Sequence, residues 1–215
     1  MVHEILEDQP DVCLEILYPP DWPRPHAAPG TVSHFILDGA LFKTLDLFGT
    51  RAPLLVCQTP AIHTWNPESS PQGIELLCPL GDPSNVGAVL RTCHAFGVQN
   101  VILLKESASP FHPKSVRSAS GALFQITFFQ GPSIDDLHQA TTGSAIVALE
   151  VQGNCLSTFQ WPRDVRLLIG EEGKGLPAQQ FPQYLSIPMV KGMHSLNAAV
   201  AASIGMYAYR LQHPW

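Results

Sequence analysis

The chain has 215 residues, 45% hydrophobic and 14% charged, so it can bury a core of one or two domains and is not a disordered polyelectrolyte. No apolar run approaches the ~18 residues that span a bilayer, and the acidic start lacks a signal-peptide pattern, so we expect a cytoplasmic protein. The net charge of −6 falls within residues 1–72, because residues 73–215 sum to zero. This distribution excludes a basic nucleic-acid-binding arm at the front of the chain.

The five cysteines and nine histidines carry no common metal or hydrolase signature. The cysteines are odd in number and form no C-x-x-C pair. We therefore expect small buried thiols rather than a disulfide framework or a structural zinc site, and no metal. H-E-x-x-H and G-x-S-x-G motifs are also missing from the sequence.

Proline-rich segments interrupt the first third of the chain. Residues 19–29 hold five prolines, which excludes a helix or a central strand, and residues 60–72 are typical of a linker. Between them we expect a small αβ unit, with a strand at residues 34–37, a helix at 40–48 and a strand at 54–57. Residues 1–72 contain no recognisable motif, and we interpret them as a substrate-binding or accessory region.

From Gly73 the chain alternates apolar strands with helices. Apolar side chains recur at helical spacing in residues 85–96 and 196–211, which predicts two helices. Strands are expected at residues 74–80, 101–104, 124–129, 145–149, 165–169 and 184–187. This alternation favours an α/β fold over residues 73–215, with a mostly parallel sheet covered by helices on both faces.

Three polar clusters each follow an expected strand, where ligands bind in open α/β sheets. The first contains Asn85 and Arg91, and alone it could be a helix cap followed by a solvated charge. The second, residues 170–175, holds three glycines that let a backbone approach a ligand closely, although alone it could be an exposed turn. The third, residues 187–201, leads into an alanine-rich helix with Ser195 as the expected cap, and alone it could be ordinary capping.

The second cluster also has to be compared with two nucleotide-binding motifs, because both are rich in glycine. It is not a P-loop, because Lys174 is followed by Gly175 rather than by Ser or Thr. Gly173-x-Gly175-x-x-Ala178 formally matches the dinucleotide fingerprint, but Pro177 falls where the helix should run. A nucleotide-dependent oxidoreductase is therefore kept as an alternative, which binding of a nicotinamide cofactor would favour.

Together, the clusters resemble the three signatures of the SpoU (TrmH-like) RNA ribose methyltransferases, a family of the SPOUT class. The matching segments are Asn85-x-Gly87-x-x-x-Arg91, Gly170-x-Glu172-Gly173-x-Gly175-Leu176, and Ile187-Pro188-Met189 with Ser195-Leu196-Asn197. Order and spacing agree over about residues 74–211, and residues 113–124 are also similar to the family. Glu171 and Ala198 depart from the family's more usual residues, and neither replaces a catalytic position.

The resemblance implies a SPOUT-type fold with a deep C-terminal trefoil knot, a homodimer, and S-adenosylmethionine as cofactor. Three loops, at residues 148–153, 170–175 and 187–196, would hold the cofactor, with apolar side chains beside its adenine. The implied cofactor-binding residues are Leu149, Gly153, Ile169, Gly170, Glu172, Gly173, Gly175, Ile187, Met189, Ser195 and Leu196. The apolar, alanine-rich last helix is an independent reason to expect a two-fold interface.

The implied reaction is transfer of a methyl group from the sulfonium to a ribose 2′-hydroxyl of structured RNA, either tRNA or rRNA. The resemblance places Arg91 near the 2′-oxygen as the proposed base, but a guanidinium is effectively always protonated. Arg91 would therefore either pass the proton on with help from an RNA phosphate or only stabilise the developing alkoxide. Asn85 and Asn197 would position the RNA or Arg91. Glu172 would orient the catalytic loops or the arginine, and Ser195 would contact the site.

RNA contacts are expected from three basic side chains, Lys114, Arg117 and Lys174, which would bind phosphates. No membrane partner is expected. The main alternative to an enzyme is a catalytically inactive RNA-binding or assembly protein that retains the fold. The five polar residues at the matching motif positions argue against that alternative.

Overall fold

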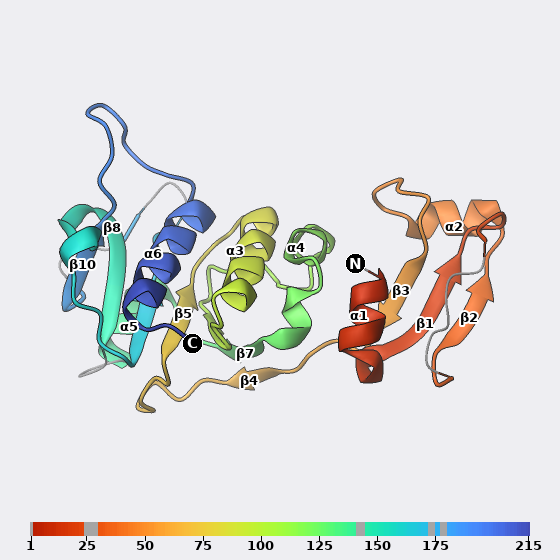
Figure 1. Cartoon of the computed structure of the whole chain (residues 1–215), viewed down its shortest axis with the longest axis horizontal. Coiled ribbons are helices and arrows are strands. Elements are labelled where there is room, and N and C mark those ends of the chain that lie inside the picture. Colours follow the sequence, from red (N-terminus) through yellow and green to blue (C-terminus); the bar gives the residue numbers. More distant parts are fainter. Residues whose placement is uncertain (1, 24–29, 141–144, 172–174, 177–179) are drawn as a thin grey trace. The chain divides into compact units, whose positions relative to one another are not determined.

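The chain folds as two compact units, Met1–Pro60 and Ala61–Trp215 (Figure 1). The computed structural model of the chain describes residues 2–23, 30–140, 145–171, 175–176 and 180–215. The division falls earlier than the expected boundary after residue 72, because β4 (Ile62–Thr64) already pairs with β7 (Thr127–Gln130) of the larger unit. Within the described part of the chain, no helix is long and apolar enough to cross a bilayer.

The smaller unit contains a three-stranded sheet. Its elements are α1 (Val2–Asp8), a 3-10 helix at Pro10–Val12, β1 (Cys13–Tyr18), β2 (Ser33–Ile36), α2 (Gly39–Leu45) and β3 (Leu54–Cys57). β1 lies at the centre, parallel to β2 and antiparallel to β3. Leu6, Ile16 and Tyr18 belong to its core. The expected strand, helix and strand are confirmed here, whereas α1 and β1 were not expected.

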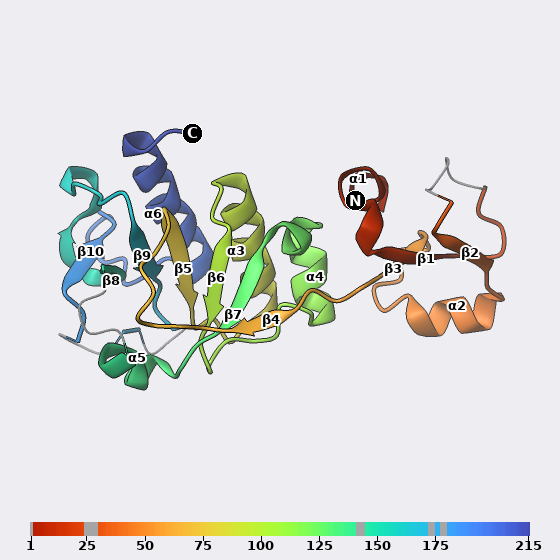
Figure 2. The same cartoon turned by 90° about the horizontal axis from the view of Figure 1, so that it is seen from below.

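The larger unit is built on a seven-stranded sheet in which every neighbouring pair is parallel. The order across the sheet is β10-β8-β9-β5-β6-β7-β4 (Figure 2). The remaining strands are β5 (Ile74–Cys78), β6 (Asn100–Leu103), β8 (Ile146–Cys155), β9 (Val165–Leu168) and β10 (Gln183–Ser186). The expected parallel sheet is confirmed. One expected strand begins late, because Ala122–Gln125 form a 3-10 helix before β7.

Helices cover both faces of this sheet. They are α3 (Pro83–Ala95), α4 (Pro113–Ala119), α5 (Ile134–Ala140) and α6 (Ala198–Gln212), with a further 3-10 helix at Leu156–Thr158. Alternate strand residues point to opposite faces, so Leu76 joins the core under α3 and α6, whereas Leu77 joins the core that contains Leu137 of α5. Figure 1 shows α3 and α6 side by side. The expected α/β fold class is confirmed, and the trefoil knot stays a prediction.

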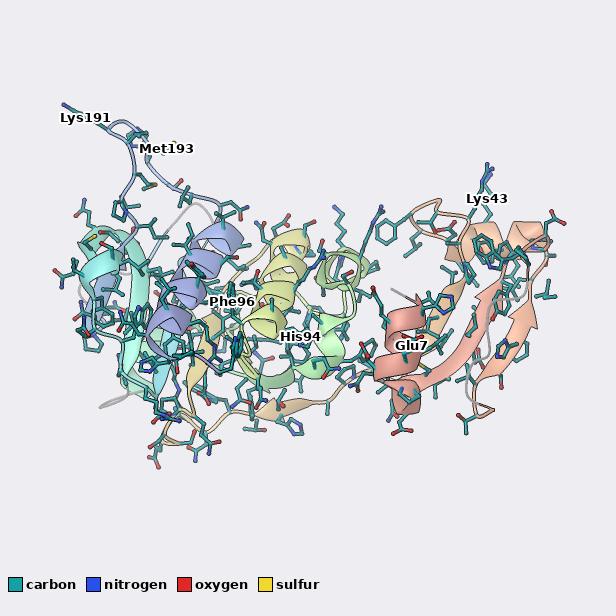
Figure 3. The ribbon with its side chains drawn as sticks, in the orientation of Figure 1. Glu7, Lys43, His94, Phe96, Lys191 and Met193 are labelled. Carbon is teal, nitrogen blue, oxygen red and sulfur yellow. The ribbon has the colours of Figure 1, made fainter. Side chains whose placement is uncertain are left out.

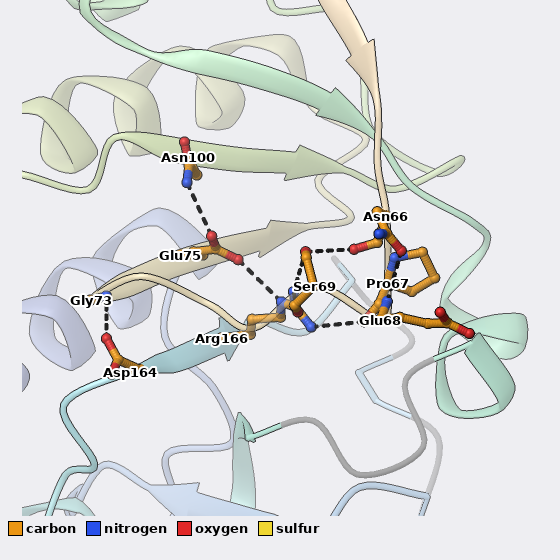
Figure 4. Close-up of polar contacts among 9 residues, drawn as sticks. All are labelled: Asn66, Pro67, Glu68, Ser69, Gly73, Glu75, Asn100, Asp164 and Arg166. Carbon is orange, nitrogen blue, oxygen red and sulfur yellow. Dashed lines mark hydrogen bonds and ion pairs between the residues drawn. The ribbon is translucent and has the colours of Figure 1, made fainter.

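A buried ion pair between residues near the starts of β5 and β9 also holds the segment after β4 (Figure 4). Arg166 of β9 is fully buried, and its Nε donates to Oε2 of Glu75 at 3.1 Å. The same guanidinium donates to the Pro67 carbonyl at 3.2 Å and lies 5.0 Å from the centre of the Trp65 ring. Asn100 donates to the other Glu75 oxygen at 3.0 Å. The segment expected as a linker is therefore fastened to the sheet.

Candidate active site

A cavity of about 540 Å³ lies at the carboxyl ends of β9 and β10 and beside the middle of β8. Its walls include Asn85 at the start of α3, residues 149–151 of β8, Gly170 and Gly175 after β9, and side chains from residues 185–201. All three polar clusters of the sequence therefore meet at one cavity. It lies at the edge of the sheet where open α/β folds bind ligands.

The segment between β10 and α6 supplies the apolar wall. Ile187, Met189 and Leu196 line the cavity. Lys191 and Met193 lie near the tip of the same loop, which extends away from the sheet (Figure 3), and both side chains are exposed. The wall can therefore pack against a flat apolar group, while the tip remains open to a larger partner.

Most of the expected cofactor-binding residues meet at this cavity. Those that line it are Leu149, Gly170, Gly175, Ile187, Met189, Ser195 and Leu196. Ile169 does not line it, because this side chain is 1% exposed and packs into the core beneath α3 and α6. Gly153 does not line it either, because its carbonyl turns to β10 and accepts from the Ser186 hydroxyl at 2.9 Å.

Three expected site residues lie outside the described part of the chain. They are Glu172, Gly173 and Lys174, all in the second cluster. Their roles stay predictions from the resemblance. The dinucleotide-type match also falls partly on such residues, since it includes Gly173 and Ala178.

The loop expected at residues 148–153 is part of β8, with an interruption in its pairing. Tyr184 of β10 pairs with Ala148, but the next residue, Leu185, pairs with Asn154. The residues between them are skipped by this ladder and bulge from it. Residues 149–151 of this bulge line the cavity, and their contact with a cofactor stays a prediction.

Asn85 and Asn197 join the first and third clusters directly. Asn197 Nδ2 donates to Asn85 Oδ1 at 2.9 Å, and both residues line the cavity. The Oδ1 atom of Asn197 accepts from the backbone N–H groups of Ala199 and Val200, so its amide orientation is fixed by the cap. Two residues distant in sequence thus form one polar wall.

Helix caps set the positions of both asparagines. Asp82 caps α3 and accepts from the Asn85 N–H at 3.0 Å, which holds Asn85 in the first turn. The cap of α6 is Asn197 rather than the expected Ser195, because the helix begins at Ala198. Ser195 instead lies in the preceding segment and lines the cavity.

The basic residues expected to act on RNA lie on adjacent helices. Arg91 of α3 is exposed and is not part of the cavity wall in the described residues. Lys114 and Arg117 are exposed on α4. The two helices pack closely at Gly87, where a side chain would clash with the Ser115 carbonyl oxygen. The three basic groups are therefore carried by one pair of packed helices.

Glu150 is a cavity residue that the sequence analysis missed. Its Oε2 accepts from the Leu176 N–H at 3.0 Å, and its Oε1 accepts from the Val151 N–H at 2.7 Å. The carboxylate therefore ties the β8 bulge to the glycine-rich segment after β9. The available signal was a carboxylate directly after the apolar run 145–149, at the end where ligands bind.

Comparison with known proteins identifies the family. Residues 76–207 match the model of the SpoU rRNA Methylase family, and the chain belongs to this family. It is 44% identical over 210 residues to "Ribosomal RNA small subunit methyltransferase G 2" of Syntrophobacter fumaroxidans, covering 97% of this chain and 42% of the relative. It is 33% identical over 136 residues to "23S rRNA (uridine(2479)-2′-O)-methyltransferase" of Streptomyces viridochromogenes, covering 58% of this chain and 47% of the relative. The chain thus spans about half the length of these relatives.

Solved structures share the fold over both units. The SpoU methyltransferase AviRb from Streptomyces viridochromogenes, in complex with AdoMet, aligns with a TM-score of 0.78 and 24% identity, covering 97% of this chain and 86% of that one. An AdoMet-bound rRNA methyltransferase from Sinorhizobium meliloti aligns with a TM-score of 0.74 and 21% identity, covering 99% and 85%. The fold class inferred from the sequence is that of these methyltransferases.

Proposed function

We propose that this chain transfers the methyl group of S-adenosylmethionine to a ribose 2′-hydroxyl of a structured tRNA or rRNA. The observation that carries the proposal is the hydrogen bond between Asn85 and Asn197, since it brings two signature motifs together at one cavity. Family membership and the 2′-O-methyltransferase activity named for a relative support the same reaction.

The cavity suits the methyl donor in size and chemistry. Its volume of about 540 Å³ is typical of small-molecule sites. Ile187, Met189 and Leu196 offer an apolar surface for adenine, and Gly170 and Gly175 leave backbone groups within reach of a ligand. When bound, the donor supplies an electrophilic methyl group on a sulfonium.

The protein's part in the reaction is to orient the hydroxyl and to stabilise charge. The ribose oxygen loses its proton as it bonds to the methyl carbon, while the sulfur keeps the electrons of the broken bond. Arg91 is permanently cationic, so it stabilises the developing alkoxide or relays the proton together with an RNA phosphate. Asn85 and Asn197 hold the reacting groups in line, which lowers the entropic part of the barrier.

RNA binding is assigned to the helix pair α3 and α4. Lys114 and Arg117 are exposed next to the helix that carries Arg91. Because the chain has only 12 Lys and Arg residues and a net charge of −6, a local basic surface must supply the attraction to phosphate. Residues 1–72 remain a substrate-binding or accessory region, and a cytoplasmic location stays part of the proposal.

A homodimer is the proposed assembly. α6 exposes Val200, Tyr207 and Leu211, spaced seven and four residues apart on one side of the helix. A two-fold interface would bury such a stripe against its own copy. The stripe begins in the first turn of α6, next to the cap residue Asn197, so assembly would also cover the edge of the site.

The proposal is tested with purified protein, isotope-labelled S-adenosylmethionine and separate pools of unmodified tRNA and rRNA. Transfer of label into one pool, lost in Arg91→Ala, supports the reaction and names the substrate class. Donor binding without transfer to either pool would point to another RNA or a missing partner, whereas the absence of both binding and transfer would favour the non-catalytic RNA-binding alternative. Binding of a nicotinamide cofactor without donor binding would favour the oxidoreductase.

A further inference from the structure

The carboxylate of Glu150 occupies the cavity wall and belongs to none of the three signature motifs. It follows Leu149, a buried residue of β8, inside the bulge that the β10 ladder skips. A carboxylate at such a position needs a reason, because placing a charge near apolar groups is unfavourable unless something compensates it.

The described residues around Glu150 fix the carboxylate without neutralising it. Within the described part of the chain, its hydrogen bonds come from uncharged backbone N–H groups, those of Val151 and Leu176. Gly175 lies next to this carboxylate, since a Cβ atom added at Gly175 would be 3.1 Å from Oε2 of Glu150. The φ of Gly175, +70°, also suits glycine. The carboxylate is therefore held in place between two walls of the cavity.

Acidic side chains predominate among the ionisable groups that the structure describes around the cavity. Among the described residues that line it, the ionisable side chains are Glu150, Glu171 and His194, and none is Lys or Arg. In a partly enclosed site of lowered dielectric, such a wall attracts a cation more strongly than bulk water would allow.

We propose that Glu150 is the residue that makes the cavity prefer the cationic methyl donor over its neutral-sulfur product. This inference rests on the proposed function. S-adenosylmethionine carries one positive charge more than S-adenosylhomocysteine, located on the sulfonium. When the methyl group leaves, the sulfur retains the bonding electrons and becomes neutral. The attraction to Glu150 then falls, and the product dissociates more readily than the donor.

Equilibrium titration calorimetry with three ligands tests this inference. The ligands are S-adenosylmethionine, S-adenosylhomocysteine, and sinefungin, in which an amine-bearing carbon replaces the methylated sulfur. Glu150→Gln keeps one acceptor oxygen for Leu176 but removes the charge. We expect it to weaken both cationic ligands about tenfold and to change S-adenosylhomocysteine less than twofold.

Two further variants separate charge from packing. Glu150→Asp keeps the charge on a shorter side chain, so it should keep the preference for cationic ligands even if all three bind more weakly. Glu106→Gln is the matched control, because the Glu106 carboxylate also accepts a backbone N–H, that of Ile134, outside the cavity wall. All three affinities should stay unchanged in that variant.

The possible outcomes distinguish this inference from the proposed function. Equal weakening of the three ligands by Glu150→Gln, with the fold intact by circular dichroism, would show that Glu150 only anchors the loop and would overturn the inference. Unchanged affinities in that variant would overturn it as well. If the wild-type protein binds none of the three ligands, the proposed function itself fails, and the inference fails with it.

Discussion

Asn197 performs two tasks with one side chain. Its Oδ1 caps α6, and its Nδ2 donates to Asn85 across the cavity. The sequence placed this residue in the third motif but assigned the cap to Ser195, because both are good capping residues within one short segment. Only the start of the helix at Ala198 distinguishes them, and helix boundaries are the least certain part of sequence reasoning.

Substitutions at Asn197 should separate these two tasks. Asn197→Ala loses both, so we expect a loss of about 1 kcal/mol in stability and at least tenfold slower methyl transfer. Asn197→Asp keeps the cap but cannot donate to Asn85, so its melting temperature should stay near that of the wild type while its transfer rate falls. Thermal unfolding and initial rates measure the two effects. An aspartate variant with wild-type rates would exclude a catalytic use of this contact.

The cysteines should differ sharply in reactivity toward iodoacetamide. Hydrogen bonding to Ser157 lowers the pKa of Cys155, whereas burial raises the pKa of Cys57 to about 12 and that of Cys93 well above its usual value. A lowered pKa increases the thiolate fraction at neutral pH, and the thiolate is the nucleophile. Mass spectrometry should therefore find Cys155 alkylated first and Cys93 only after unfolding. Early modification of Cys93 in the native protein would contradict this order.

Among the elements, strands made of apolar runs could be predicted from the sequence, whereas strand segments with polar residues could not. The runs at 74–80 and 165–169 predicted β5 and β9 closely, since both strands are buried on both faces. β8 was expected to end at residue 149, but it continues through an exposed, polar stretch to Cys155. Pairing with β10 resumes only at Asn154 and Cys155, after the bulge, and no periodicity in the sequence reports such pairing.

Two short helices of the larger unit, α4 and α5, escaped prediction for a related reason. α4 has seven residues and begins at Pro113, after a cap in which His112 accepts from the Lys114 N–H. Histidine is not among the usual capping residues, and one or two turns are too few for a clear helical period. Tertiary packing at Gly87 stabilises this helix against α3.

The buried pair of Arg166 and Glu75 should dominate the stability of the segment that follows β4. Arg166→Met leaves a carboxylate buried without its partner, which costs about 3–5 kcal/mol in comparable cases. Urea unfolding should show this loss, and the double variant Arg166→Met with Glu75→Leu should recover much of it. A single variant within about 1 kcal/mol of the wild type would mean that water compensates the remaining charge.

At the scale of the whole molecule, the class of fold and the location of the site were predictable, and the division into units was less so. Strand alternation predicted the parallel sheet, and the three clusters predicted residues that line one cavity. The proline-rich residues 60–72 suggested a linker, but β4 pairs with β7, and Arg166 binds the segment that follows β4. These are long-range contacts, which local composition does not report.

The proposed homodimer predicts that a charge on α6 disrupts assembly. Leu211 is 66% exposed on the apolar stripe, so Leu211→Glu should convert the dimer into a monomer in sedimentation experiments at micromolar concentration. Leu47, which is 68% exposed in the smaller unit, provides the matched control, and Leu47→Glu should remain dimeric. A wild-type protein that sediments as a monomer would remove the basis for this interface.

We infer that the cavity lined by Asn85 and Asn197 directs a methyl group to a ribose oxygen. Digestion of the reacted RNA to nucleosides, followed by mass spectrometry, identifies the methylated atom most directly. We expect one 2′-O-methylated nucleoside, with a yield that falls at least tenfold in Asn85→Ala. Methylation on a base, or full ribose methylation by that variant, would contradict it.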